Sequence, residues 1–327
     1  MSNEYIEQLK AKYHVDDETR EQVIQQYIDT ETAGKTPRQT PLAVVVGGQS
    51  GAGKTVLMHK FSTQTDGVQV DNDAMRELHP QIEKIRREEP AYKKECTDQL
   101  SLSSTPFIIS KLSGDNPTGE KFNQTIHQTM KNTTIAKMAI PELKSKGYVV
   151  GVAVLAVSYA ESKQSQIERT HAQYQSFGTC RHVAPSDHMD AINGLPPTIG
   201  FIEDNNIADF IFVYTRNYEN IAEPILQHVY LNPNTLQTTI PVLQEYGLQN
   251  EDFQNTFESA QSAIIKLREL DEARCMETLG DRIDAVIEDG GYNVPGMGEH
   301  LQEIIDYSKQ YAISHQSPAE PFPPTEN

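Results

Sequence analysis

The residues with the clearest chemical use form the stretch GGQSGAGKT, which ends at Thr55. It fits G-x-x-x-x-G-K-[ST], the P-loop pattern, in which glycines let backbone N–H groups converge on phosphate oxygens. Lys54 can reach the β- and γ-phosphates, and Thr55 can ligate Mg²⁺. A chance glycine-rich turn would match too, but here an apolar run precedes the motif and an expected helix follows it. We therefore predict a nucleoside triphosphate site built from Gly48, Gln49, Ser50, Gly51, Ala52, Gly53, Lys54 and Thr55.

Three acidic or amide side chains follow the next expected strand. In VQVDNDAMRELHP, the residues Asp71, Asn72 and Asp73 stand where the strand ends. We expect this strand beside the P-loop strand, at the sheet edge where open α/β sheets bind ligands. An Asp there could accept the proton of a substrate hydroxyl that attacks the γ-phosphate, with the neighbouring two residues binding substrate. The alternative is structural, because Asn and Asp often form turns. We interpret His79 as structural, with Pro80 ending its helix.

Alternating strands and helices must position these groups. We expect strands in the apolar runs at residues 42–48, 67–75, 146–158 and 207–216. We expect helices at residues 1–30, 54–61, 81–112 and 160–177. This alternation predicts an α/β fold with a parallel sheet flanked by helices on both faces.

Composition changes divide the chain into four expected parts. The stretch 29–41 is typical of a linker by its Gly, Pro and Thr content. After residue 218 the strand signal fades and apolar residues take a helical spacing. The Pro-rich end is typical of disorder. The expected parts are an N-terminal helical segment with its linker, a P-loop core, an added helical C-terminal region and a disordered tail, at 1–40, 41–217, 218–315 and 316–327.

Charge and cysteine content exclude several classes. The 327-residue chain has 28 Lys and Arg against 46 Asp and Glu, a net charge of −18, so we expect no nucleic-acid partner. Neither a signal peptide nor an apolar run long enough to span a membrane is found, so we expect no membrane partner. Cys96, Cys180 and Cys275 are far apart, which favours free thiols in a reducing, cytoplasmic compartment. Delivery into another cell by a route without a cleaved signal would leave no trace in the sequence.

The order of the motifs adds a family resemblance. No GTPase-type N-K-x-D stretch is found, so a small-molecule kinase is the simpler interpretation. GGQSGAGKT, followed about twenty residues later by DNDAMRELHP, resembles the zeta toxin family of P-loop kinases. Three later segments resemble the family in the same order, so the resemblance covers about residues 40–217. These segments are IERT (167–170), GTCRHVAP (178–185) and ADFIFVYTRN (208–217).

The resemblance implies a fold, a reaction and roles. It implies a P-loop kinase core that uses ATP and Mg²⁺ at Lys54 and Thr55, with Asp73 as the catalytic base. It implies that Arg169 and Arg181 bind phosphates and stabilise charge on the transferred group, a role that the planar, permanently charged guanidinium suits. The family's best-known acceptor is a sugar hydroxyl of UDP-N-acetylglucosamine, and some relatives phosphorylate nicotinamide dinucleotides. An antitoxin-like inhibitor protein is an implied partner.

The chain departs from the family pattern in FNQTIHQTMKNTT, residues 122–134. The family has an apolar strand there, followed by E-G-T-x-R. Counting back from KGY (146–148) places His127 on the Glu, Thr129 on the Thr and Lys131 on the Arg. Two interpretations stay open: a strand that leads to a changed substrate pocket containing these three residues, or an exposed helix. The first weakens the transfer of UDP-N-acetylglucosamine as substrate more than it weakens kinase chemistry.

Three functions therefore stay open. The first is a kinase that phosphorylates a hydroxyl of a nucleotide-sugar or nucleotide-like small molecule. The second is a nicotinamide-dinucleotide or nucleoside kinase. The third is a nucleotide-binding interaction protein, in which the altered segment marks lost catalysis and the acidic, helical C-terminal region binds a protein.

Overall fold

The computed structural model describes residues 3–178, 180, 182–248 and 253–315. These residues form a six-stranded sheet in the order β2-β3-β1-β4-β5-β6. The first five strands in that order are parallel, and β6 is antiparallel to β5. The expected α/β fold with a mostly parallel sheet is confirmed. The strands are β1 (Leu42–Gly47), β2 (Val68–Val70), β3 (Gln124–His127), β4 (Val149–Leu155), β5 (Phe210–Thr215) and β6 (Ile225–Leu231).

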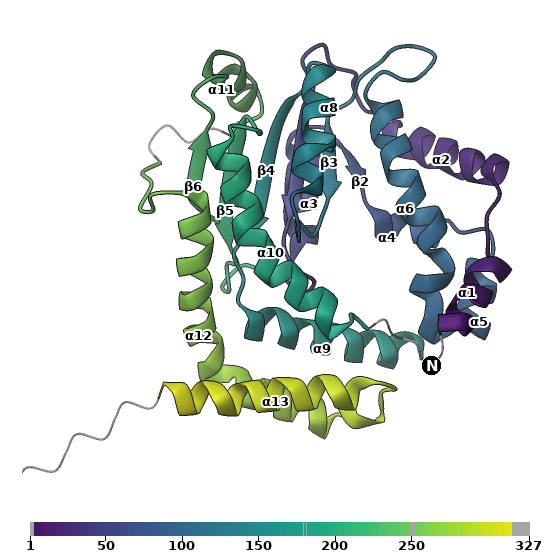
Figure 1. Ribbon diagram of the computed structural model, residues 1–327, viewed down its shortest axis with the longest axis vertical. Helices are drawn as coiled ribbons and strands as arrows, with labels where there is room; N and C mark the ends of the chain where they lie inside the picture. Colours follow the sequence, from purple (N-terminus) through teal and green to yellow (C-terminus); the bar gives the residue numbers. More distant parts are fainter. Residues whose placement is uncertain (1–2, 179, 181, 249–252, 316–327) are drawn as a thin grey trace, which may run out of the picture.

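Helices cover both faces of this sheet. They are α1 (Asn3–Lys12), α2 (Asp17–Thr32), α3 (Lys54–Gln64), α4 (Asn72–Glu77), α5 (Ile82–Glu88), α6 (Lys93–Leu112), α7 (Thr134–Lys137), α8 (Ala139–Ser145), α9 (Tyr159–Phe177), α10 (Pro185–Asp204), α11 (Leu236–Glu245), α12 (Ala260–Glu288) and α13 (Met297–Ser314), with 3₁₀ turns η1 (Pro90–Tyr92) and η2 (Gly291–Asn293). Side chains alternate between the faces of a strand. Val44 and Val46 of β1 therefore pack on the side of α3 and α11, and Val45 packs on the side of α2, α6, α8 and α10 (Figure 1).

The segment 122–134 contains a strand, so the exposed-helix interpretation is wrong. Strand β3 is polar in sequence, yet Gln124 and Thr125 are buried. The Gln124 amide donates to Ser113 Oγ at 2.9 Å and to Tyr148 Oη at 3.0 Å. A buried polar side chain is tolerated where it is hydrogen-bonded. These long-range partners explain how Gln124 is accommodated in a buried strand, whereas Thr125 Oγ1 has no hydrogen-bond partner among the described residues.

Strand β2 does not lie beside the P-loop strand, in contrast to the prediction. β3 lies between them, pairing with β1 on one side and β2 on the other. His127 is in register with Val46, one residue before the end of β1. The carboxyl end of β3 is therefore the strand end closest to the P-loop on this side of the sheet.

Two further differences concern elements that flank the core. The helix expected over 81–112 is two helices, α5 and α6, because Pro90 begins a 3₁₀ turn between them. Strand β6 was not predicted, and it extends the sheet past residue 217. Most β6 side chains are half-buried at the sheet edge, so its sequence lacks the strong apolar pattern of the central strands.

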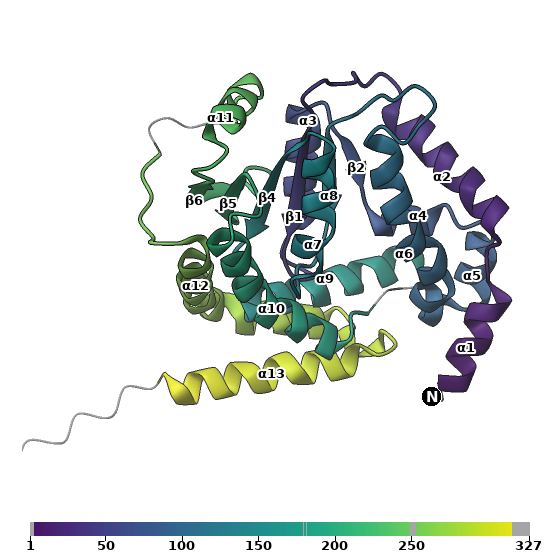
Figure 2. The same ribbon diagram turned by 45° about the horizontal axis from the view of Figure 1, so that its top comes forward.

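Helix α12 begins beside β5, β6 and α10, and its later part packs with α9 and α13 at the carboxyl end of the sheet. Helix α9 begins directly after β4, and it crosses the carboxyl ends of the strands, with α13 beyond it in both views (Figures 1 and 2). A separate apolar cluster joins α9, α12 and α13 through Ile167, Leu279, Ile283, Leu301 and Ile304. No helix among the described residues is long and apolar enough to span a membrane. The division of the chain into parts stays a prediction, and the tail 316–327 lies outside the described residues.

Candidate active site

The P-loop turns from β1 into α3 with little space around it. Gly51 has φ +81°, a conformation that residues with a Cβ rarely adopt. A Cβ added there would lie 2.0 Å from the carbonyl oxygen of Ser162 in α9. The glycine at this position is therefore required both by the turn and by the close approach of α9.

Replacing Gly51 with alanine should destabilise the protein more than the same change in an open turn. The control is Gly34→Ala, because Gly34 has φ +77° but nothing within 4 Å of its added Cβ. We expect Gly34→Ala to cost about 1–2 kcal/mol from backbone strain. Gly51→Ala should cost about 1–3 kcal/mol more from overlap with Ser162. Urea denaturation measures both, and equal costs would contradict the close packing described above.

Lys54 places its charge inside the curve of the loop. Its side chain is 8% exposed, and Nζ donates to the carbonyl oxygens of Gly48 at 2.8 Å and Gln49 at 3.0 Å. The side chain of Gln49 is fully buried, whereas Thr55 is exposed in the first turn of α3. The loop thus has a cation where phosphate oxygens would approach and a hydroxyl at its open side.

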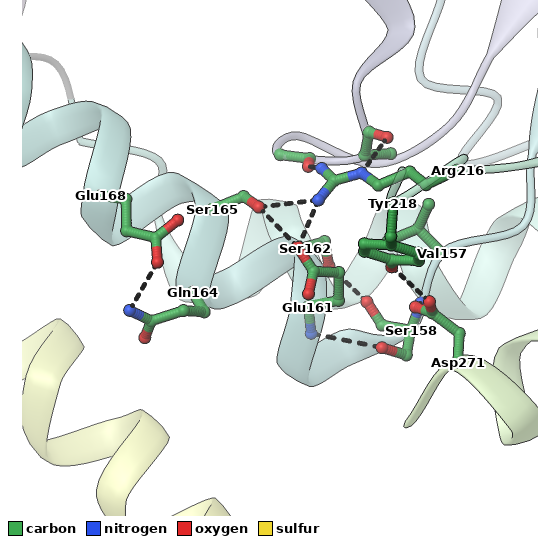
Figure 3. A network of polar contacts seen from close by, with 12 residues as sticks. Val157, Ser158, Glu161, Ser162, Gln164, Ser165, Glu168, Arg216, Tyr218 and Asp271 are labelled. Carbon is green, nitrogen blue, oxygen red and sulfur yellow. Dashed lines mark hydrogen bonds and ion pairs between the residues drawn. The ribbon is translucent and has the colours of Figure 1, made fainter. Parts of the chain in front are cut away.

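Arg216 binds the outer side of the loop, where the carbonyl oxygens of Gly51 and Ala52 lie (Figure 3). It directly follows β5, and its guanidinium donates to the carbonyl oxygens of Gly51 and Ala52, the latter at 3.1 Å. The same guanidinium pairs with the carboxylate of Glu161 and donates to Ser165 Oγ at 2.9 Å, both in α9. Arg216 therefore joins β5, the P-loop and α9.

Glu161 is the buried acid at the centre of this network. Burial would raise the pKa of its carboxyl, but the hydrogen bond from Arg282 and the charges of Arg216 and Arg282 hold that pKa below its usual value. The carboxylate is therefore ionised at neutral pH. Neither Glu161 nor Arg216 is among the site residues predicted from the sequence. The position of Arg216 at the carboxyl end of a predicted strand was an available signal, but Glu161 had none.

Helix α9 also carries the first predicted arginine to the loop. Arg169 is exposed, and its Nη2 lies 3.4 Å from Ser50 Oγ. One turn earlier, Gln166 Nε2 donates to the Ser50 carbonyl at 2.9 Å. Arg169 thus lies beside the P-loop, where it can contact a bound phosphate. Arg181, the second predicted arginine, lies outside the described residues.

Asp71 and Asn72 have local structural contacts. Asp71 is the N-cap of α4 and accepts from the Asp73 backbone N–H at 2.9 Å and from His127 Nδ1 at 3.1 Å. Burial would raise the pKa of Asp71, but the hydrogen bond and charge of His127 hold it below its usual value. The Asn72 side-chain oxygen accepts from Thr105 of α6. Both residues therefore make the kind of contacts that the structural interpretation expects. Substrate binding by either residue stays a prediction.

Asp73 differs from these two neighbours in its accessibility. Its side chain is 47% exposed, and Oδ1 lies 3.2 Å from Nε of the buried Arg76. Arg76 also pairs with Asp98 of α6 at 2.7 Å. The Asp73 carboxylate is thus oriented by a fixed cation and is still open to solvent, as a group that must reach a substrate requires. His79 is buried, and its Nε2 lies 3.0 Å from the Tyr13 carbonyl, which fits the structural interpretation.

The segment after β3 is folded against the end of β1. Met130 has φ +54°, and its Sδ lies 2.6 Å from the position that a Cβ of Gly47 would take. Thr129 is exposed, and Lys131 Nζ lies 3.5 Å from Asp187 of α10. The structure thus brings His127 and Asp71 together, whereas the described contacts of Lys131 lie toward α10.

The donor set fits a magnesium ion held largely by phosphates. Among the described residues, no group of three or more His, Cys, Asp or Glu side chains could hold a metal ion alone. Mg²⁺ in nucleotide sites commonly takes one or two protein oxygens together with phosphate oxygens and waters. Thr55 offers such an oxygen at the open side of the loop.

A family model, two similar proteins and a solved structure all relate this chain to zeta toxins. A family model described as zeta toxin matches residues 25–222. Toxin PezT of Streptococcus pneumoniae serotype 4 is 28% identical over 209 residues, which cover 59% of this chain and 81% of that protein. Toxin zeta of Enterococcus hirae is 27% identical over 201 residues, which cover 58% and 68% respectively. A solved structure of the PezAT chromosomal toxin–antitoxin system of S. pneumoniae has the same fold, with a TM-score of 0.57, 23% identity and coverage of 81% of this chain and 98% of that chain.

Proposed function

Since this chain belongs to the zeta toxin family, we propose that it is a kinase that transfers the γ-phosphate of ATP to a hydroxyl group of a nucleotide-like small molecule. One observation carries the proposal. A P-loop with a buried lysine and an accessible, oriented carboxylate share the carboxyl edge of one sheet. That edge is where parallel α/β sheets bind their ligands.

The strand order supports a suitable distance between the P-loop, where ATP would bind, and Asp73, where the acceptor hydroxyl would lie. β1 leads into the P-loop, β2 leads to Asp73, and β3 lies between them. Neighbouring strands lie about 4.8 Å apart, so the ends of β1 and β2 are about 10 Å apart. A transferred phosphoryl group and the attacking hydroxyl fit within such a span. The intervening strand thus favours the role of Asp73 as base, although β2 was predicted to lie next to β1.

In the proposed reaction each side chain has one task. The acceptor hydroxyl oxygen forms a bond to the γ-phosphorus as the bond between that phosphorus and the β–γ bridging oxygen breaks, and ADP leaves with that oxygen. Asp73 takes the hydroxyl proton. Lys54 and Arg169 stabilise the negative charge on the phosphate oxygens. Bound Mg²⁺, with Thr55 as a ligand, would neutralise charge on the β- and γ-phosphates.

Two classes of small molecule are candidates for the phosphate acceptor. A nucleotide sugar, with UDP-N-acetylglucosamine as the family default, is the first candidate. A nicotinamide dinucleotide or a nucleoside is the second, because His127 stands where the family pattern has Glu. An imidazole paired with Asp71 offers a hydrogen-bond donor or acceptor, where Glu offers a negative charge. The resemblance also supports an antitoxin-like inhibitor protein as partner, as in the toxin–antitoxin system named above.

The test is a panel of acceptors with the purified full chain. ATP, Mg²⁺ and each nucleotide sugar, nicotinamide dinucleotide or nucleoside are mixed, and ADP release and the phosphorylated product are measured together. We expect equal amounts of ADP and product with one acceptor class, and loss of both when EDTA removes Mg²⁺. ATP binding without product for every acceptor would favour the nucleotide-binding interaction protein instead.

A further inference from the structure

Helix α12 lies outside the residues that the family model matches, yet it contacts the P-loop directly. Arg268 Nη2 donates to Gln49 Oε1 at 2.9 Å, and Arg268 Nη1 donates to the Ile192 carbonyl of α10 at 2.7 Å. The other end of the Gln49 amide donates to the Val157 carbonyl, just after β4, at 2.6 Å. The second residue of the P-loop is therefore held between the sheet and α12.

A second arginine of α12 reaches the loop through two further side chains. Arg282 pairs with Glu161 at 2.6 Å and with Glu168 at 2.8 Å, both in α9. Glu161 pairs in turn with Arg216, which donates to the carbonyl oxygens of Gly51 and Ala52 (Figure 3). This chain of charged contacts runs from α12 through α9 to the outer side of the loop.

The part of α12 between the two arginines is fixed to the same core. Asp271 Oδ2 accepts from the Ser158 backbone N–H at 2.8 Å, and Asp271 Oδ1 accepts from the Tyr218 hydroxyl. Ile264 and Leu267 of α12 pack in the main apolar cluster. The helix is thus held along its length, and both guanidinium groups have defined positions. Burial lowers the pKa of Arg268 to about 10, so it stays charged at neutral pH.

The direction of these contacts matters for phosphate binding. The C=O and N–H of one planar peptide unit point in opposite directions. Arg216 binds the Gly51 and Ala52 carbonyls on the outer side, so the N–H of Gly53 is turned toward the inner side of the loop, while the Ala52 N–H donates to the Gln49 carbonyl at 3.2 Å and closes the turn. Inward N–H groups are the donors that a phosphate-binding loop needs. Contacts on the outer side therefore set the shape of the inner side.

We propose that α12 is part of the nucleotide site and that Arg268 and Arg282 are positioning residues, which hold the P-loop in its phosphate-binding shape. The inference rests on the proposed function only in that ATP is the ligand of the loop. Neither arginine needs to touch ATP. Their effect should therefore fall on nucleotide affinity first.

The test compares nucleotide affinity in variants of the full chain. A non-hydrolysable ATP analogue with Mg²⁺ is titrated by calorimetry into wild type, Arg268→Ala and Arg282→Ala. The matched control is Lys266→Ala, which removes a positive charge from an exposed position of the same helix. We expect each arginine variant to bind about 10–100-fold more weakly, the equivalent of one lost charged hydrogen bond. The control should stay within about twofold of wild type.

Conservative variants distinguish positioning from general stability. Arg268→Lys can still donate to the single Gln49 oxygen and should recover most of the affinity. Arg282→Lys cannot bridge two carboxylates with a planar fork and should recover little. Affinity within about twofold of wild type in folded Arg268→Ala and Arg282→Ala, whatever their melting temperatures, would overturn the proposal. If the alanine variants do not fold, affinity within about twofold of wild type in Arg282→Lys has the same meaning.

The proposed function and this inference can fail separately. A wild-type chain that binds the analogue but phosphorylates no acceptor would contradict the kinase reaction, and the affinities above would still decide the role of α12. A wild-type chain that does not bind the analogue would overturn both.

Discussion

Replacing Asp73 with asparagine should lower the turnover number by about 10²–10⁴-fold, the usual contribution of a general base. Asparagine has the same shape but cannot take the proton of the acceptor hydroxyl. The strand that leads to Asp73, β2, is separated from the P-loop strand by β3, so the affinity for ATP should change little. Steady-state turnover with the acceptor found in the panel, together with calorimetry of the ATP analogue, separates the two quantities.

The control for this prediction is Asp98→Asn. Asp98 and Asp73 both pair with Arg76, but Asp98 comes from α6. If Asp73 only holds Arg76 in place, the two variants should lose similar activity. If Asp73 is the base, only its replacement should approach the full loss. Turnover above a tenth of wild type in Asp73→Asn would exclude it as the base.

The parts that the sequence predicted are those with local causes. The P-loop pattern has glycines where the backbone needs positive φ, so the conformation of this loop can be predicted from GGQSGAGKT alone. Strands β1, β4 and β5 are buried on both faces, and their continuous apolar runs make them visible in the sequence. The family resemblance depended on these same segments, and the family match now confirms it.

The parts that the sequence missed have causes far away in the chain. Strand β3 was left open in the sequence between a strand and an exposed helix, because it is stabilised by amide contacts from Gln124 to Ser113 and Tyr148 that no local pattern encodes. Without β3, the order of β1 and β2 could not be predicted correctly. Arg268 reaches Gln49 across 219 positions, and Arg282 reaches Glu161 across 121. A charged residue on a long helix is most often a solvated one, so its sequence alone gives no reason to assign it to the site.

The same contacts change how the C-terminal helices are understood. The acidic helical region was one reason to consider an interaction protein. In the structure, α12 completes the packing of α9 and the P-loop through Arg268 and Arg282. A region that supports the nucleotide site in this way is consistent with the kinase proposal, and it does not require loss of catalysis.

Replacing Lys54 with alanine should reduce turnover by at least about 10²–10³-fold, the loss typical when one preorganised donor to transition-state charge is removed. The expected loss exceeds that of a neutral donor, because a buried ammonium acts where water screens its charge poorly. The loop carbonyls of Gly48 and Gln49 would also lose their shared donor. Single-turnover kinetics at saturating ATP measures the chemical step directly.

Two comparisons make the Lys54 result specific. Lys60→Ala removes the same charge from a half-buried position later in the same helix, α3, and should leave turnover within about twofold, since Lys60 lies outside the P-loop. Lys54→Arg keeps the charge but replaces a compact ammonium with a broad planar fork, which cannot make the same two contacts to the Gly48 and Gln49 carbonyls, so it should not restore activity. Full activity in Lys54→Arg would mean that charge alone matters at this position. Full activity in Lys54→Ala would mean that the loop does not act on the γ-phosphate, and phosphoryl transfer at this edge of the sheet would have to be abandoned.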